Sequence, residues 1–493
     1  MTETSVPPNA GNVEGPDRRR RLVILAVCCM SLFIVGMDAT IVNVALPAIG
    51  RDFHASVSGL QWVVDAYLVV LASFLMLSGS TADRLGRRRT FQAGLSLFTL
   101  GSLLCSIAPS LQWLIVFRMV QAVGGSMLNP VAMSIIRNVF HDPKERAQAV
   151  GLWGATVGVS IAMGPVLGGA LVQAVGWRAI FWVNIPIGLA AIVLAAKFVP
   201  ESRAPHPRRL DLVGQLLVMA VLFSLTFGII EGPKAGWLSA EIIALFSITV
   251  VGIAGILIYE PRRHQPLVEL RFFRSVPFSG ATVIAVSAFA AFSGFLFLNT
   301  LYLQDVRGLS ALEAGVCTLP MAAMTITISP VSGWLVGRFG SRPSLLAAGG
   351  MLSLASLMLT GLADSTSYAW LLASYFVFGT GFGFVNPPIT TTAISGMPPE
   401  QAGVAAAIAS TSRQIGQSLG VAVVGVAATS GIAHMSLHEG LAVGSHPGWW
   451  IVFGCSVVVL LLGFLTTTRW AMTTVVAATA ERQETGQLVA ADR

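Results

Sequence analysis

Long hydrophobic runs separated by short polar segments are the dominant pattern in this chain. Each run is about 20 residues long, which suits an α-helix that crosses a bilayer and exceeds the length of a barrel strand. The runs cover residues 22–46, 59–80, 91–108, 112–136, 149–174, 180–199, 210–230, 240–259, 278–301, 311–336, 345–362, 370–393, 403–428 and 449–467. The pattern therefore predicts an all-α membrane protein with fourteen transmembrane helices.

The distribution of basic residues supports this helix count. If the N-terminus is cytoplasmic, 24 of the 30 Lys and Arg residues fall in cytoplasmic segments, 4 fall in outer loops, and Arg118 and Arg413 fall inside helices. Cytoplasmic loops of membrane proteins carry such an excess of Lys and Arg. One helix more or fewer would destroy the bias, so we expect both termini in the cytoplasm.

Composition agrees with a membrane protein and excludes several other classes. The chain is 54% hydrophobic and 11% charged, whereas a soluble domain has roughly 25% charged residues. The net charge of +7 reflects membrane orientation and requires no nucleic acid. The five cysteines lie in hydrophobic runs without metal-ligand spacing. We find no hydrolase triad and no nucleotide-binding loop, so we expect no cofactor and no enzymatic activity.

An internal repeat divides the chain. The loop from Gly79 to Arg88 and the loop from Gly333 to Arg342 share Gly, Arg, Gly and Arg in the same frame, and two helices carry Asn-Pro at 129–130 and 386–387. Parallel six-helix repeats are one known transporter architecture. We predict the following organisation: an N-terminal six-helix bundle at residues 1–200, a linker with two inserted helices at 201–276, a C-terminal six-helix bundle at 277–470, and a cytoplasmic tail at 471–493.

Three ionisable residues lie inside predicted membrane helices. Asp38 lies about 12 Å below the outer face, and Asp65 and Arg118 lie about 9 Å from the outer ends of their helices. Burial favours the neutral form of a carboxyl group, while a neighbouring Arg favours the charged form. A carboxylate under both influences can bind and release a proton. The alternative interpretation is a static ion pair that only holds helices together.

Several motifs occur together in one order. The loop from Gly79 to Arg88 reads Gly-x-x-x-Asp-Arg-x-Gly-Arg-Arg, and the helix from Arg118 reads Arg-x-x-Gln-Ala-x-Gly. The fifth helix carries Gly154, Gly158, Gly164, Pro165, Gly168 and Gly169. These motifs resemble those of the major facilitator superfamily, and more narrowly its fourteen-helix drug:proton antiporter branch. Ala122 departs from the glycine of the second motif.

The resemblance implies roles for these residues. Arg118 would take part in proton transfer, Asp38 in coupling, and Asp65 would be a second candidate for protonation. A cytoplasmic latch would be formed by Gly79, Asp83, Arg84, Gly86, Arg87 and Arg88, and we expect Asp83 to face residues 401–403. The second copy has Gly337 where the first has Asp83, so its latch should be weaker.

The resemblance also implies a cytoplasmic seal and a substrate cavity. The fifth helix, with its antiporter motif, would seal the cytoplasmic side and mark an exporter. Candidate residues of the substrate cavity are Asn43, Tyr67, Gln121, Asn386, Arg413, Gln414 and Gln417. From its position near the midplane, Arg413 could line the cavity or neutralise a carboxylate. Asn386 precedes two prolines that should bend its helix.

The function expected from these residues is proton-coupled export across the cytoplasmic membrane. An antiporter would exchange protons for lipophilic, often cationic, drugs by alternating access. A dedicated exporter of one endogenous metabolite or antibiotic is the alternative, and a non-transporting sensor is a third hypothesis that explains the motifs poorly. We expect a monomer whose partners are small substrates, protons and lipid. The short outer loops give no indication of a periplasmic adaptor.

Overall fold

The computed structural model describes residues 17–204, 210–263, 267, 269–395, 402–430, 444–471 and 473–474, and every regular element in these ranges is helical. Most of the predicted tail at 471–493 lies outside them. The N-terminal helices are α1 Arg18–Phe53, α2 Val57–Leu85, α3 Arg87–Ser106, α4 Leu111–Val139, α5 Pro143–Ala174, α6 Ala179–Trp182 and α7 Asn184–Phe198. Two long helices follow, α8 Leu212–Ala235 and α9 Ala240–Tyr259.

The C-terminal helices follow two short 3-10 turns, η1 Glu260–Arg262 and η2 Leu270–Arg274. They are α10 Val276–Leu301 with the π-helical turn η3 Tyr302–Val306, α11 Ala311–Cys317, α12 Leu319–Phe339, α13 Ser341–Leu359, α14 Tyr368–Gly383, α15 Asn386–Ile394, α16 Ala402–Ser430 and α18 His446–Leu465. Each predicted hydrophobic run coincides with one helix or with two consecutive helices. As expected, the run at 370–393 is interrupted directly before Asn386.

Side-chain caps begin many of the helices. The Ser56 hydroxyl accepts a hydrogen bond from Gly59 N at the start of α2, and Ser110 does the same for Trp113 N at the start of α4. Asp142 caps α5, and Ser310 forms a reciprocal capping box with Glu313 at α11. Such caps satisfy backbone N–H groups that have no partner within the helix.

Length and hydropathy mark eleven helices of the described residues as candidate membrane spans, and a bent α5 would be a twelfth. The helices α3 and α16 are 20 and 29 residues long but are not among those eleven. The prediction of an all-helical, multi-pass protein is confirmed, while the count of fourteen spans stays a prediction.

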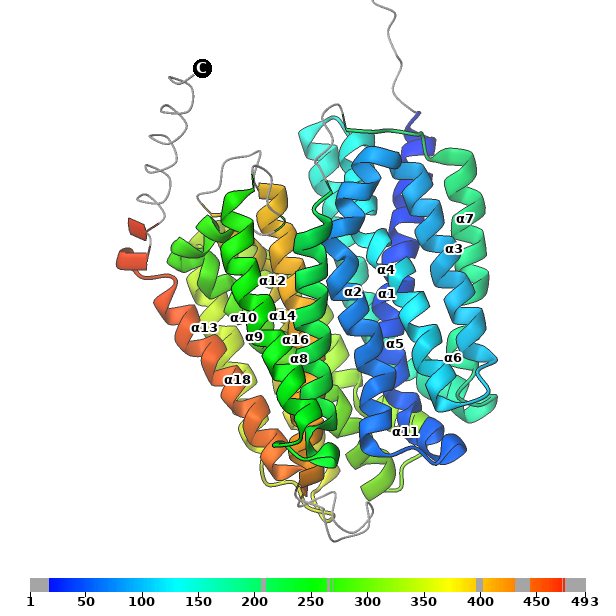
Figure 1. The fold of residues 1–493 in the computed structure, drawn as a ribbon, viewed down its shortest axis with the longest axis vertical. Helices are drawn as coiled ribbons and strands as arrows, with labels where there is room; N and C mark the ends of the chain where they lie inside the picture. The colour runs from blue at the N-terminus through cyan, green and yellow to red at the C-terminus, as the bar shows by residue number, and fades with distance from the viewer. Residues whose placement is uncertain are drawn as a thin grey trace, which may run out of the picture.

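The hydrophobic side chains form two large clusters. One is built mainly from α1–α7, and the other mainly from α10–α18. The two groups of helices lie side by side in Figure 1, with α8 in front of the line between them. The helix α8 packs on α2 and on α16, whereas α9 packs mainly on α8. The boundaries expected at residues 200, 276 and 470 stay a prediction.

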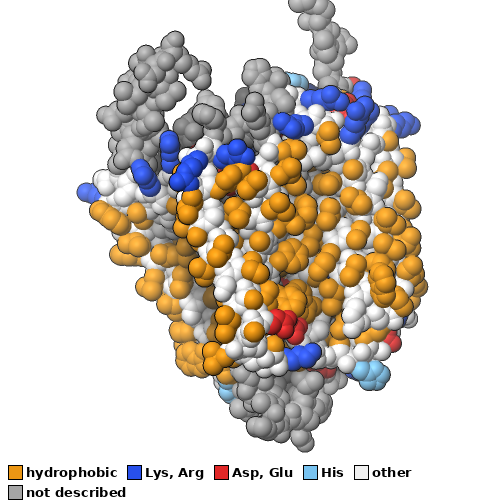
Figure 2. Space-filling view, in the orientation of Figure 1, with side chains coloured by type: hydrophobic (Ala, Val, Ile, Leu, Met, Phe, Trp, Pro, Cys, Tyr) orange, Lys and Arg blue, Asp and Glu red, His pale blue; other side chains and the backbone are white. Residues whose placement is uncertain are grey.

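The two ends of the molecule differ in charge. On the face shown in Figure 2, most Lys and Arg side chains lie at the end where α1 begins, and hydrophobic side chains cover the middle. We call this the basic end. The helix α11 lies at the opposite end in Figure 1.

Candidate functional site

The centre of the N-terminal half contains a buried ion pair. Arg118 of α4 contacts Asp38 of α1 through its Nη1, and the two side chains are 1% and 0% exposed. The sequence predicts Asp38 and Arg118 at a similar depth, and the structure places them in direct contact. Because both charges are removed from water, each depends on its partner and on the polar groups around it.

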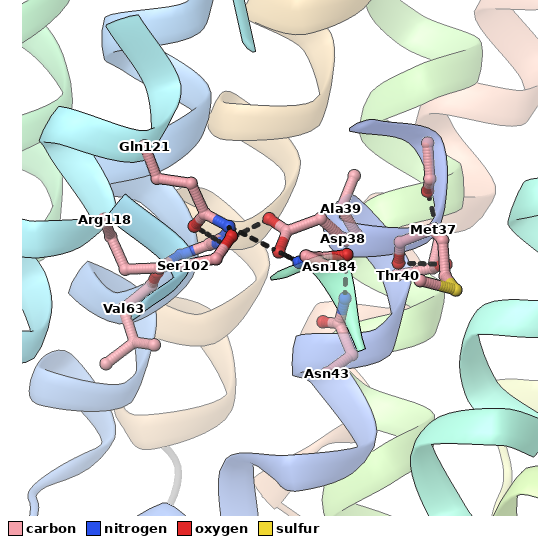
Figure 3. A network of polar contacts seen from close by, with 11 residues as sticks. Met37, Asp38, Ala39, Thr40, Asn43, Val63, Ser102, Arg118, Gln121 and Asn184 are labelled. Atoms are coloured by element: carbon pink, nitrogen blue, oxygen red, sulfur yellow. Dashed lines mark hydrogen bonds and ion pairs between the residues drawn. The ribbon is translucent and has the colours of Figure 1, made fainter. Parts of the chain in front are cut away.

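Two amide side chains complete the surroundings of the Asp38 carboxylate. Gln121 donates from Nε2 to Asp38 Oδ1 at 2.8 Å, and Asn184 of α7 donates from Nδ2 to the same oxygen at 2.9 Å. Gln121 also accepts a hydrogen bond from Arg118 at 2.7 Å and donates to the Ser102 hydroxyl at 2.8 Å. Figure 3 shows these side chains from α1, α3, α4 and α7 converging on Asp38.

Arg118 is also held from the side of α2. Its Nε donates to the carbonyl oxygen of Val63 at 3.2 Å, and its Cζ lies 4.1 Å from the centre of the Tyr67 ring. The face of an aromatic ring attracts a cation in this geometry. A proton arriving at Asp38 would weaken the ion pair and leave Arg118 to the Val63 carbonyl, Gln121 and Tyr67. The arrangement thus links the charge on Asp38 to the packing of α1 against α2 and α4.

Asp65 is separate from this network. It lies on α2 and is completely buried, and neither of its carboxylate oxygens has a hydrogen-bond partner in the described residues. Its nearest polar neighbour is Ser418 of α16, in the other half of the molecule. The structure therefore places Asp65 where the two halves meet, and not beside Arg118.

The candidate cavity residues fall in different surroundings. Tyr67 and Gln121 are buried with Arg118, so they belong to its network. Asn43 lines a small cavity, together with Pro165 and Asn299. Asn386 begins α15 and is half-buried.

The remaining candidates lie on α16. Arg413, Gln414 and Gln417 are all partly exposed. Arg413 forms no ion pair in the described residues, so the expected neutralisation of a carboxylate is not seen. Its one hydrogen bond in these residues goes from Nη2 to the Thr390 hydroxyl of α15, at 2.7 Å.

The expected latch loop makes several contacts within the N-terminal half. The Asp83 carboxylate pairs with Arg87, four residues along the chain, at 3.3 Å. The loop binds the segment after α7, because Arg87 N donates to Ser202 O at 2.9 Å and Arg88 N donates to the Glu201 carboxylate at 3.2 Å. The expectation that Asp83 faces residues 401–403 stays a prediction, because Gln401 lies outside the described residues.

The glycines of the antiporter motif have three different surroundings, which are α1, α11 and open space. A Cβ on Gly164 or Gly168 would collide with Thr40 or Ile41 of α1, so these two positions allow α5 to approach α1 closely. A Cβ on Gly169 would lie 2.4 Å from the carbonyl oxygen of Ala311 in α11. Gly154 has no atom within 4 Å of the corresponding point, and for Gly158 the nearest is 3.8 Å away.

Gly169 lies in a close contact between α5 and α11. A Cβ on Gly315 of α11 would in turn lie 2.4 Å from Pro165 O, so α5 and α11 touch backbone to backbone. We call this contact the α5–α11 seam. It lies at the end opposite the basic end (Figure 1). Nearer the basic end, Gly154 has no such neighbour, and a seal formed there by the fifth helix stays a prediction.

A second contact between the halves depends on residues that sequence reasoning missed. Gln61 of α2 donates from Nε2 to the carbonyl oxygens of Val421 and Ala422 at 3.0 and 2.9 Å. A Cβ on Gly425 would collide with the same Gln61 side chain. We call this contact the α2–α16 seam. Asp65, which faces Ser418, lies one turn further along α2. Gln304 also crosses between the halves and donates to Val44 O at 2.8 Å.

Comparison with known proteins agrees with this arrangement. The sequence model of the Major Facilitator Superfamily matches residues 28–421. The chain belongs to this superfamily. It is 39% identical over 407 residues to the multidrug resistance protein Stp of Mycobacterium tuberculosis, which covers 83% of this chain and 76% of the relative. It is 38% identical over 411 residues to the tetracenomycin C resistance and export protein of Streptomyces glaucescens, with the same coverage.

A solved structure of the superfamily shares the fold. The structure is that of a bacterial homologue of the human lysosomal transporter Spinster in an inward-facing and occupied conformation, with a TM-score of 0.65 and 16% identity. The alignment covers 94% of this chain and 99% of the other. The protein is thus a multi-pass membrane transporter of the Major Facilitator Superfamily that acts on small substrates.

Proposed function

We propose that this superfamily member is a proton-coupled antiporter that exports small lipophilic compounds across the cytoplasmic membrane. The observation that carries the proposal is the buried pair of Asp38 and Arg118, with Gln121 and Asn184 bound to the same carboxylate. The export function of two relatives supports the direction and the class of substrate. The energy source is the proton gradient, and no cofactor is required.

Proton binding at Asp38 is the proposed coupling step. When Asp38 is charged, it holds α1 against α4 through Arg118. When Asp38 is protonated, this attraction is lost and the helices can take the arrangement that favours the opposite opening. Coupling requires that proton and substrate favour different conformations, because a ligand shifts an equilibrium only by its differential affinity. Asp65 is a second candidate for protonation, and it would be protonated while the α2–α16 seam is closed.

The proposed topology has fourteen spans with both termini in the cytoplasm, in line with the excess of Lys and Arg on cytoplasmic loops. The basic end then faces the cytoplasm. Both seams lie toward the outer side, so this conformation is closed to the outside and accepts substrate from the cytoplasm. We propose that one copy of the chain suffices for transport.

A dedicated exporter is the second candidate function. The 38% identity to a protein named for tetracenomycin C resistance and export favours it. In that case the cavity would accept one compound made by the producing cell, and the coupling residues would remain the same.

The proposed function is tested by efflux of ethidium from inverted vesicles with an imposed pH gradient. We expect gradient-dependent transport by the wild type, its loss in Asp38→Asn and Arg118→Ala, and its retention in Asp52→Asn. Asp52 serves as the control because it is an exposed carboxylate that pairs with Arg178 at the surface. Transport that survives both substitutions would refute coupling at Asp38. A wild type that is inert towards ethidium would favour the dedicated exporter.

A further inference from the structure

Arg413 forms no ion pair with any described residue. It lies in α16 about 17 Å from the start of the helix, where an unpaired charge is costly to keep in a membrane protein. Arg118, the other arginine inside a predicted membrane helix, is paired with Asp38. Arg413 has no such partner in the described residues, and its Nε is buried without an acceptor.

Acidic residues are scarce in the part of the sequence that surrounds Arg413. Between residues 314 and 430 the only acidic residues are Asp364 and Glu400. Asp364 lies between α13 and α14, in a loop, and Glu400 lies thirteen residues before Arg413 and outside the described residues. Asp65 of α2 faces Ser418 of α16. Ser418 lies about 140° around α16 from Arg413, so Asp65 and Arg413 lie on different sides of this helix.

The surroundings of Arg413 provide positioning and further polar groups. The Thr390 hydroxyl accepts one hydrogen bond from the guanidinium and holds it against α15. Gln417 follows Arg413 by four residues, and side chains at this spacing share one face of a helix. Gln414 lies about 100° around the helix from Arg413. All three α16 side chains are partly exposed, so a solute can reach them. A guanidinium with free N–H groups matches a carboxylate or a similar oxyanion.

We infer that Arg413, with Gln414 and Gln417, forms a subsite for the anionic group of a lipophilic substrate, an inference that rests on the proposed export function. The compounds recognised there carry a carboxylate, a sulfonate or an acidic phenol on a hydrophobic frame. The anion supplies the counter-charge that the protein lacks. The same uncompensated charge disfavours cationic drugs at this position, contrary to the preference that the family resemblance implied.

Equilibrium binding to the purified full-length protein in detergent tests this inference. The probes are fluorescein, an anion at neutral pH, and tetramethylrhodamine methyl ester, a cation with the same xanthene ring system. We expect Arg413→Gln to weaken fluorescein binding by about tenfold, because hydrogen bonds to charged groups contribute about this much. Cation binding should stay the same or become tighter. Arg413→Lys should keep much of the affinity for fluorescein.

Arg342→Gln is the matched control, since it removes an arginine without an ion pair from the start of α13 in the same half. It should leave fluorescein binding unchanged. Equal fluorescein affinity in the wild type and Arg413→Gln would overturn the inference, and so would an equal loss of both probes. Gradient-driven efflux is measured separately. Arg413-dependent fluorescein binding without such efflux would retain the subsite and refute the proposed function.

Discussion

The α5–α11 seam predicts that one methyl group at Gly169 will open the molecule on the side opposite the basic end. A Cβ there would lie 2.4 Å from Ala311 O and 2.8 Å from Leu312 Cα, whereas ordinary contacts begin at 3.4 Å. The obstacles are backbone atoms that cannot rotate away, so the helices must separate by about 1 Å. Overpacking of this kind costs about 1–3 kcal/mol. The open conformation of Gly169→Ala should therefore gain about 5- to 150-fold in population relative to the closed one.

Electron paramagnetic resonance distances can measure this shift. Spin labels at Ser56→Cys and Asp364→Cys, two exposed loop positions in opposite halves, would be placed in a protein whose five native cysteines are replaced by alanine. Gly169→Ala should move the distance distribution to longer values. Gly154→Ala, in the same motif but with no atom near its added Cβ, should not. Unchanged distances in Gly169→Ala, or an equal change in both variants, would refute the reasoning.

Three further predictions follow from the buried polar groups. Arg118→Gln should melt at a lower temperature in detergent, because breaking a buried ion pair costs about 3–5 kcal/mol, and adding Asp38→Asn should restore part of the loss; an additive effect would contradict this. Asp65→Asn should melt no lower than the wild type, because neither oxygen accepts a hydrogen bond from a described residue, yet should weaken gradient-driven efflux. Gln61→Leu should weaken the α2–α16 seam by about 1 kcal/mol and lengthen the same spin-label distances, and unchanged distances would count against it.

Depth in the membrane could be predicted from the sequence, whereas direction around a helix could not. Counting residues at 1.5 Å each placed Asp38 and Arg118 at one level, and the structure brings them into contact. Asp65 was placed at that level too, but it follows Val63 by two residues and therefore points about 200° around the helix from it. Val63 faces Arg118, so Asp65 faces the other half. Which side of α2 meets which neighbour depends on the packing of whole helices.

The candidate residues predicted from the sequence omit Asn184 and Gln61, which form their contacts through side-chain amide groups. Asn184 and Gln61 are uncharged, so they do not stand out in a hydrophobic run as Arg118 does. Both are nonetheless buried, and a buried amide in a membrane helix requires a partner. The need of each buried amide for a partner could have pointed to Asn184 and Gln61 as functional residues. It could indicate that a partner exists, but Asp38 and the carbonyl groups of α16 lie far away in sequence.

The pair α8 and α9 has a consequence for how such chains can change in evolution. In the proposed topology, the two helices leave one side of the membrane and return to it, so α10 enters in the same direction as it would without them. A single added helix would turn the whole second half upside down, exchange the sides of its arginines and abolish the parallel repeat. Since α9 packs mainly on α8, the hairpin can be acquired or lost as one unit without reorienting either half.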